Sequence, residues 1–344
     1  MFSDYNYDNK ADRHSFTLTD VDLGIVNAIR RIILAEIPVV GFYGEEEPTI
    51  EIIFNNGPLH NEFMIHRVGL IPLHISEDIT ENYEDNDYEF ELNVENKGTD
   101  IINITTGEFT GTYKGNQLTK AELDVIFPTN KTTKSKILIT RLRGGEHVHI
   151  KAKAIKRTGK LNASFSPVSL ANFYYIEDKT EAAKHSNILD KQRSYYKNLY
   201  GDPTQINFQI ESINNLSYKY LFNKAINIII EKLESLIEKL LSREIPIEQV
   251  GELENSFNFT IENEDDTLGN LIQSIIHSKY IRAKNNNECL YVGYICPHPL
   301  INRLIVRFTL NTTNKEQFYK FFIDNCKEII KIMEITKGEW QKFK

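Results

Sequence analysis

The sequence contains little cysteine and no long hydrophobic run. Three of its 344 residues are cysteines, Cys289, Cys296 and Cys326, and no two of them have the C-x-x-C spacing. An odd number of cysteines without that spacing argues against a disulfide framework and indicates a reducing compartment. No apolar run approaches the roughly 18 residues that a membrane span needs, so we expect no contact with a membrane.

An excess of positive charge is also lacking. The chain has 40 Lys and Arg against 48 Asp and Glu, a formal net charge of −8, whereas a free-standing nucleic-acid binder is usually basic. The phosphate loop, the G-x-S-x-G elbow and the H-E-x-x-H motif are absent, as is an Asp triad suited to catalytic magnesium. We therefore predict that the isolated chain is not an enzyme.

The first informative stretch is Thr19–Pro38, which reads TDVDLGIVNAIRRIILAEIP. Thr19 with Asp22 three residues later predicts a capped helix start, and Pro38 predicts the helix end. Apolar residues at helical spacing predict one buried face. The opposite face carries Leu23, Asn27, Arg30 and Leu34, with Arg31 on its flank. Arginines among leucines fit either a docking surface or a solvated face, and the residues alone leave both open.

A second stretch, Asn56–Leu73, reads NGPLHNEFMIHRVGLIPL. Its pattern predicts a short helix from near Pro58 to Gly69, because proline favours a first helical turn and glycine a helix end. Before these two stretches, Met1–His14 is polar and is expected to be a loose tail, followed by a short strand. Between them, Thr49–Phe54 alternates as a strand does.

The two motifs and their order resemble a known family. N-A-I-R-R-I-I, then E-I-P, then H-N-E-F-M-I-H-R-V-G-L-I-P-L is similar to the alpha-like assembly subunits of multisubunit DNA-directed RNA polymerases. That family includes the third-largest subunit of eukaryotic polymerase II and its archaeal counterpart. The resemblance implies a non-catalytic subunit that docks the second-largest polymerase subunit. The implied docking residues are Asn27, Arg30, Arg31, His66, Arg67, Gly69 and Leu70.

The resemblance also bears on metals. Members of the family can hold a cysteine-bound zinc, but no cysteine precedes Cys289 in this chain, so we expect no cofactor and no metal. Cys289, Cys296 and His298 have irregular spacing and lack a fourth ligand. His147 and His149 share one face of a predicted strand without a third ligand nearby, which favours a solvated strand face over a metal pair.

The middle of the chain contains an acidic run followed by a basic tract. Residues 77–100 hold ten acidic side chains against Lys97 alone, which is typical of a solvated loop, and residues 131–160 hold ten basic side chains against Glu146 alone. Between Phe90 and Val168 the pattern is mostly that of β-strands. The basic tract 131–160 is compatible with pairing to the acidic run, with an acidic partner, or with nucleic acid. The last option gives the alternative function, a stand-alone nucleic-acid-binding module.

Two later segments repeat apolar residues at spacings of four and three. The long helix expected over Ser217–Leu241 and the helix opened by Asn314 each present a heptad seam, with Asn325 inside the second seam. Such a seam fits a dimerisation helix or ordinary core. Arg243–Asn255, between them, is expected to be a linker. The residues assigned to dimerisation are Phe222, Ile226, Ile229, Leu233, Leu236, Leu240, Phe318, Phe322 and Ile329.

The chain also contains an internal repeat. N-L-I-Q-S-I-I at Asn270–Ile276 matches N-A-I-R-R-I-I at Asn27–Ile33. The C-terminal part, with G-Y-I-C-P-H-P, resembles the small alpha-like partner, which is the eleventh subunit of polymerase II or its archaeal counterpart. The chain is thus expected to be α+β, with two alpha-like dimerisation units forming an intramolecular pseudo-heterodimer. The expected domains are 1–48 with 173–245, a β-rich insert 49–172, and a second, smaller dimerisation domain 246–344.

The resemblance implies the partners. They are the largest and second-largest RNA polymerase subunits, together with small zinc-binding polymerase subunits, and DNA is contacted only indirectly through the complex. Because joining the two halves is atypical of cellular polymerases, it suggests as the source a large DNA virus of the nucleocytoplasmic class or another organism with a compact genome. The expected location is intracellular: the nucleus or, for a virus, the cytoplasmic virus factory and the virion.

Overall fold

The computed structural model describes residues 1–131, 133–283 and 288–343, so Thr132 of the basic tract lies outside the described residues. Helices and antiparallel strands are both abundant, which confirms the α+β class. Contacts divide the chain into two compact units, each described by itself. Residues 1–33, 170–210 and 222–344 form what we call the pairing unit, and residues 34–169 and 211–221 form the insert unit. This division does not test the predicted domain boundaries, which stay predictions.

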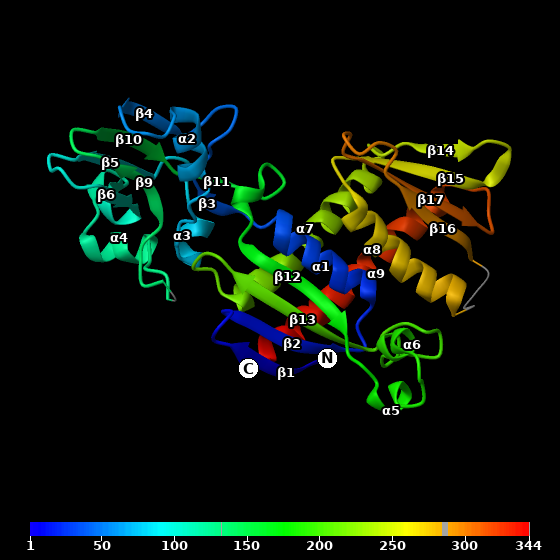
Figure 1. Ribbon diagram of the computed structural model, residues 1–344. Helices are drawn as coiled ribbons and strands as arrows, with labels where there is room; N and C mark the ends of the chain where they lie inside the picture. The colour runs from blue at the N-terminus through cyan, green and yellow to red at the C-terminus, as the bar shows by residue number, and fades with distance from the viewer. Residues whose placement is uncertain (132, 284–287, 344) are drawn as a thin grey trace. The chain divides into compact units, whose positions relative to one another are not determined.

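The first sheet of the pairing unit has the strand order β1-β2-β13-β12, and these strands lie side by side in Figure 1. The expected loose tail at Met1–His14 is wrong, because β1 pairs antiparallel with β2 and matches Phe2 with Leu18. The sequence INFQIESI over 206–213 alternates as a strand does, and β13 forms there. The bounds are β1 Phe2–Asp8, β2 Arg13–Thr19, β12 Val168–Tyr175 and β13 Gln205–Ser212.

The second sheet of the pairing unit has the order β14-β15-β17-β16 and is antiparallel throughout. The expected linker over Arg243–Asn255 is wrong, because Ile247 pairs with Phe259 in a β-hairpin. Gly251, with φ +53°, lies in the turn and takes a conformation that glycine adopts without strain. The bounds are β14 Ile247–Val250, β15 Leu253–Glu262, β16 Cys289–Ile295 and β17 Arg303–Leu310.

The pairing unit also contains the helices for which the sequence predicts apolar faces. Helix α1 begins at Leu23 and not at Thr19, since Thr19 still belongs to β2 and Asp22 accepts the first helical hydrogen bonds. A π-helical segment, His277–Arg282, extends α8. The polar excursion 177–205 holds two short helices, α5 and α6. The bounds are α1 Leu23–Ala35, α5 Lys179–Ala182, α6 Ile188–Gln192, α7 Tyr218–Leu241, α8 Asp266–Ile276 and α9 Lys315–Lys342.

The insert unit is built on a sheet of order β4-β10-β5-β7-β8, with the ladders β11-β3 and β6-β9. Its core includes the buried rings of Phe42, Phe90, Phe109 and Phe127. The bounds are β3 Val39–Gly41, β4 Ile50–Asn55, α2 Asn61–Gly69, α3 Glu77–Glu81, β5 Tyr88–Glu95, β6 Ile102–Thr105, β7 Thr110–Tyr113, β8 Asn116–Gln117, α4 Lys120–Ile126, β9 Leu138–Leu142, β10 His147–Lys153 and β11 Ile155–Arg157.

Two local expectations in the insert unit need correction. Helix α2 starts at Asn61, three residues after Pro58, because the Asn55 side chain accepts from the Gly57 N–H and donates to the Leu59 carbonyl, forming a turn first. The acidic run 77–100 is not a loop, since it supplies α3 and β5. No helix in the described ranges is long and apolar enough to cross a membrane.

Candidate docking and dimerisation surfaces

The less buried side of α1 holds the first group of predicted docking residues. Asn27 and Arg30 are half-buried, and the Arg30 Nε donates to the Asn27 Oδ1 at 3.0 Å. Burial, followed by the neighbouring positive charge of Arg31, lowers the pKa of the Arg30 guanidinium. The pair forms a fixed cationic group beside Leu23 and Leu34, which are also half-buried. Such a group suits an acidic partner, and its docking role stays a prediction.

Arg31 has a different environment from Arg30. Its Nε donates to the Thr267 Oγ1 at 2.8 Å, and its Nη2 lies 3.9 Å from the Asp265 Oδ1. Asp265 is the N-cap residue of α8, where its side chain accepts from the Thr267 N–H. Arg31 therefore ties α1 to α8 within the pairing unit. The sequence gives no signal for this contact, because the two residues lie 236 positions apart.

The predicted seam residues lie on α7 and α9, and all nine are buried. Contacts at both ends show that these helices run antiparallel. The Phe222 ring lies 4.3 Å from the Trp340 ring, between centroids. At the opposite end, Arg243 beyond α7 pairs with Glu316 of α9. Within the seams, Phe222 packs against Phe208 of β13, and Phe318 and Phe322 pack against Phe257 and Phe259 of β15. These seam residues thus form core with their own sheets, and the role of the seams as a dimerisation surface stays a prediction.

An aromatic cluster closes one end of this helix pair. The rings of Phe2, Phe16 and Phe222 surround Trp340, with centroid distances to it of 5.1, 4.8 and 4.3 Å. Phe2 comes from β1, the segment that the sequence assigned to a tail. Phe2 and the two tyrosines of this polar segment, Tyr5 and Tyr7, do not alternate regularly as a strand would, so sequence reasoning missed it.

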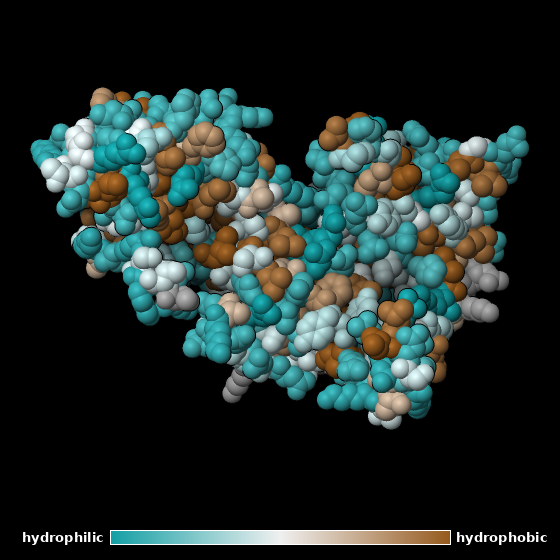
Figure 2. Space-filling model, viewed as in Figure 1, coloured by the Kyte–Doolittle hydropathy of each residue, from teal (hydrophilic) through white to brown (hydrophobic). Residues whose placement is uncertain are grey.

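The second group of predicted docking residues lies on α2 in the insert unit. His66 and Arg67 are exposed, and Leu70 is 57% exposed. Phe63, which the sequence analysis omitted, is 67% exposed on the same helix face. The spacing Phe63, His66, Arg67, Leu70 is that of one helical stripe and is the signal that identifies it. Figure 2 shows small hydrophobic spots over α2 and β4 in a mostly hydrophilic surface.

Two members of the α2 group also have structural partners. Arg67 donates from its Nε to the Ile139 carbonyl at 2.9 Å and from its Nη2 to the Leu138 carbonyl at 2.8 Å, which fixes β9 against the helix. Gly69 approaches Gly44 so closely that a Cβ on Gly69 would lie 3.1 Å from the Gly44 Cα. Arg67 thus combines an exposed side chain with a structural role, and Phe63, His66 and Leu70 are the other exposed residues of the stripe.

The structure selects among the interpretations of the basic tract. Strand β10, inside the tract, pairs antiparallel with β5, inside the acidic run. Lys153 lies 3.1 Å from Glu89, and Arg157 donates to Asp85 at 2.8 Å. Part of the tract's charge is thus neutralised within the insert unit, which disfavours the alternative of a stand-alone nucleic-acid module.

The candidate metal ligands do not form a cluster in the described residues. His147 Nε2 lies 2.7 Å from the Asn93 Oδ1, and His149 Nε2 lies 2.5 Å from the Glu91 Oε1. Burial raises the pKa of the Cys289 thiol to about 11 and also raises the pKa of Cys296. Over the described ranges, no three His, Cys, Asp or Glu side chains are placed to hold an ion. The expectation of no cofactor stays a prediction.

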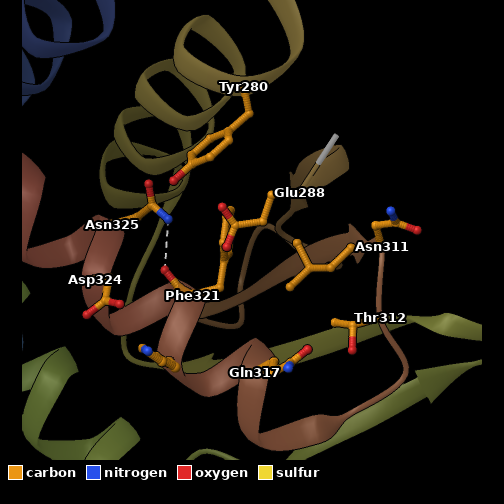
Figure 3. Close-up of a pocket in the computed structure, with 10 residues that line it drawn as sticks. Tyr280, Glu288, Asn311, Thr312, Gln317, Phe321, Asp324 and Asn325 are labelled. Atoms are coloured by element: carbon orange, nitrogen blue, oxygen red, sulfur yellow. Dashed lines mark hydrogen bonds between the residues drawn. The ribbon is translucent and has the colours of Figure 1, made fainter. Parts of the chain in front are cut away.

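A hollow of about 680 Å³ lies beside α9 in the pairing unit (Figure 3). The buried Asn325, 2% exposed, points its amide nitrogen toward its own helix, where it donates to the Phe321 carbonyl at 2.8 Å. Its oxygen lies on the side of Tyr280 and has no hydrogen-bond partner within the described ranges. Asn325 thus lines the hollow in addition to its predicted position in the α9 seam.

Comparison with known proteins supplies the family. The model of the RNA polymerase Rpb3/Rpb11 dimerisation domain matches residues 15–233, and a second model of the same description matches residues 256–339. The chain is 27% identical to DNA-directed RNA polymerases II, IV and V subunit 3 of Arabidopsis thaliana, over 49% of this chain and 55% of the relative. It is 30% identical to DNA-directed RNA polymerases I and III subunit RPAC1 of Homo sapiens, over 48% and 51%.

For a third relative, the match covers a larger share of both chains. The chain is 25% identical to DNA-directed RNA polymerase II subunit RPB3 of Schizosaccharomyces pombe, over 65% of this chain and 82% of the relative. The chain spans about half the length of the plant and human relatives. Because the match to residues 15–233 covers more than half of the chain and the second match covers most of the C-terminal part, the protein belongs to the RNA polymerase Rpb3/Rpb11 dimerisation domain family.

Proposed function

We propose that the protein is a non-catalytic assembly component of a DNA-directed RNA polymerase that brings the two largest, catalytic subunits together for transcription. The observation that carries the proposal is the pairing of two dimerisation domains in one chain. Their helices α1 and α8 touch through Arg31 and Thr267. The protein acts by geometry: the paired helices form a rigid platform with two different faces.

The docking surfaces follow from what the pairing leaves exposed. On α1 the group formed by Asn27 and Arg30 is half-buried, while Arg31 is held by α8. In the second repeat the positions of Arg30 and Arg31 are taken by Gln273 and Ser274, so the corresponding face is neutral. We assign the cationic face, with the α2 stripe, to the second-largest subunit and the neutral face to the largest. Small zinc-binding subunits join later, and DNA is contacted only through the complex.

The covalent connection between the two halves has a physical consequence. Only five residues, 242–246, separate α7 from β14. A short connection keeps the two halves at an effective concentration of roughly millimolar order, so pairing does not depend on the concentration of the chain. A compact genome, such as that of a nucleocytoplasmic large DNA virus, benefits from one gene in place of two. The protein is placed inside the cell, in the nucleus or, for a virus, in the cytoplasmic factory and the virion.

The proposal is tested by purification from the native host. The chain is tagged, isolated gently, and its companions are weighed by mass spectrometry. Two very large chains at equal stoichiometry, with template-dependent RNA synthesis, are expected. A lone species near 40 kDa, under conditions that keep the polymerase intact, contradicts the proposal.

The docking face is tested by single substitutions in the same tagged chain. Arg30→Ala is expected to reduce recovery of the second-largest subunit at least fivefold without altering thermal unfolding, since a charge-assisted contact contributes about 1.5–3 kcal/mol. Arg193→Ala, which removes an exposed arginine next to α6, is the matched control and is expected to leave recovery unchanged. Equal recovery with both variants removes Arg30 from the docking surface.

A further inference from the structure

We propose that the crossing of α1 and α8 is keyed, so that it accepts one helix from each repeat and rejects a pair of second-repeat helices. The key consists of the Gly24–Ser274 contact on one side of the crossing and the Arg31–Thr267 contact on the other. This inference concerns how the chain closes on itself, and it holds whether or not the protein joins a polymerase.

The two helices enter the crossing in equivalent ways. The repeat aligns Asn27 with Asn270, and α1 and α8 begin at matching positions, Leu23 and Asp266. Each helix is preceded by an aspartate whose side chain accepts a backbone N–H two residues later. The Asp22 Oδ1 accepts from Gly24 at 2.7 Å. The Asp265 Oδ1 accepts from Thr267 at 2.8 Å.

Two contacts join the helices, and both connect a residue in the first turn of one helix with the same later position of the other helix. On one side, the first-turn residue Gly24 faces Ser274, and the Ser274 hydroxyl donates to the Asp22 Oδ1 at 2.7 Å. On the other side, the first-turn residue is Thr267, whose hydroxyl accepts from the Arg31 Nε at 2.8 Å. Gly24 and Thr267 are equivalent in the repeat, as are Ser274 and Arg31. The positions in contact are therefore equivalent, while the spacing and the chemistry of the two sides differ: the Gly24 side has no room for a Cβ, and the Thr267 side holds one.

The space at Gly24 makes the crossing selective for a pair made of one helix from each repeat. A Cβ added to Gly24 would lie 2.7 Å from the Ser274 Cβ and 2.9 Å from the Asp22 Oδ1, closer than real Cβ atoms approach, and 3.0 Å from the Ser274 Oγ, which is also tight. In the second repeat the equivalent position is Thr267, which carries a Cβ. Two second-repeat helices crossing in this geometry would bring the Thr267 and Ser274 side chains into collision. Gly24 thus allows α8 to pair with α1 and not with a copy of itself.

The test uses the full chain and hydrogen exchange of the α8 amides, which reports local opening. Gly24→Ala is expected to speed exchange across Leu268–Ile276 about tenfold, because the crossing is overpacked. Ser274→Gly removes the clashing side chain but also weakens α8 and loses the bond to Asp22, so the double variant is compared with Ser274→Gly alone and is expected to exchange no faster than it. If Gly24→Ala gives no folded chain, folding of the double variant is the corresponding rescue.

The matched control is Gly338→Ala, at a position of α9 where an added Cβ meets nothing within 4 Å. Alanine favours helix over glycine, so this variant is expected to leave exchange unchanged or slower. An equal response of both glycine variants overturns the proposal. Faster α8 exchange in the Gly24→Ala/Ser274→Gly double variant than in Ser274→Gly alone also overturns it.

The second side of the key is tested by a double-variant cycle. Arg31→Ala and Thr267→Val are each expected to speed α8 exchange roughly fivefold, the size of one hydrogen bond. Combined, they are expected to do no more than either alone, because both remove the same contact. Fully additive effects overturn the assignment of Arg31 as a residue that positions α8.

Discussion

Replacement of Phe222 by alanine is the most direct test of how the pairing unit is held together. The Phe222 side chain is fully buried, and its ring lies 5.7 Å from Phe2, 5.5 Å from Phe16, 5.8 Å from Phe208 and 4.3 Å from Trp340, between centroids. Truncation removes contacts with strands β1, β2 and β13 and with helix α9 at once. Such a Phe→Ala change costs about 3–5 kcal/mol of unfolding free energy.

Urea unfolding followed by tryptophan fluorescence measures this cost at the right place. Trp340 is the single tryptophan of the chain and lies in the same cluster. With a urea dependence of about 2–3 kcal/mol per molar, the Trp340-detected midpoint is expected to fall by roughly 1–2 M in Phe222→Ala. Phe222→Leu keeps most of the apolar area, so its urea midpoint is expected to lie between those of the unmodified chain and Phe222→Ala.

The matched control lies on the same helix. Leu241 of α7 is 62% exposed, so Leu241→Ala is expected to change the unfolding free energy by less than about 0.5 kcal/mol. If Phe222→Ala lowers the Trp340-detected midpoint no more than Leu241→Ala does, the aromatic cluster does not hold the two repeats together. The packing argument is then refuted.

Three further predictions follow from single buried groups. Burial lowers the pKa of His74 below its ordinary 6.5, so the unfolded chain binds a proton that the folded chain does not and stability falls as pH drops below about 6.5. His74→Gln is expected to flatten the thermal-unfolding profile between pH 7 and 5. Burial raises the thiol pKa of both Cys296 and Cys326, but Cys326 is fully buried, so mass spectrometry of the alkylated folded chain is expected to find Cys296 labelled first. Tyr83→Phe removes the buried hydroxyl that accepts from the Tyr88 N–H and donates to the Ala154 carbonyl, which keeps its bond from the Asn86 N–H. It is expected to cost about 1–3 kcal/mol in thermal unfolding, whereas the exposed Tyr174→Phe is expected to be neutral.

Helices and strands with a periodic apolar pattern were predicted correctly from the sequence. The seam expected over Ser217–Leu241 became α7 with all six seam residues buried, and Asn314 caps α9 with its side chain. These features depend on neighbours three and four residues apart, so local sequence contains the information. The strand over Thr49–Phe54 was found for the same reason, because alternation is also a local property.

Features that depend on distant partners escaped sequence reasoning. Met1–His14 reads as a tail because β1 is polar and exposed apart from Phe2, whose partners include Trp340 at the other end of the chain. Arg243–Asn255 reads as a linker because its strand pairs only after Gly251 reverses the chain. The start of α1 at Asp22 was missed in favour of Thr19, although the repeat already aligned Asp22 with Asp265.

The sequence by itself determined the family, the repeat and the two groups of docking candidates, because motif order and helical spacing are properties of the linear chain. The tertiary structure alone decided how the two neighbouring arginines differ. Arg30 stays beside Asn27 on the surface of α1, whereas Arg31 reaches Thr267 across the crossing. Because an α-helix has about 3.6 residues per turn, adjacent positions point roughly 100° apart, so which arginine meets the second repeat depends on where α8 packs. That placement is set by the close approach of Gly24 and Ser274, which only the folded chain brings together.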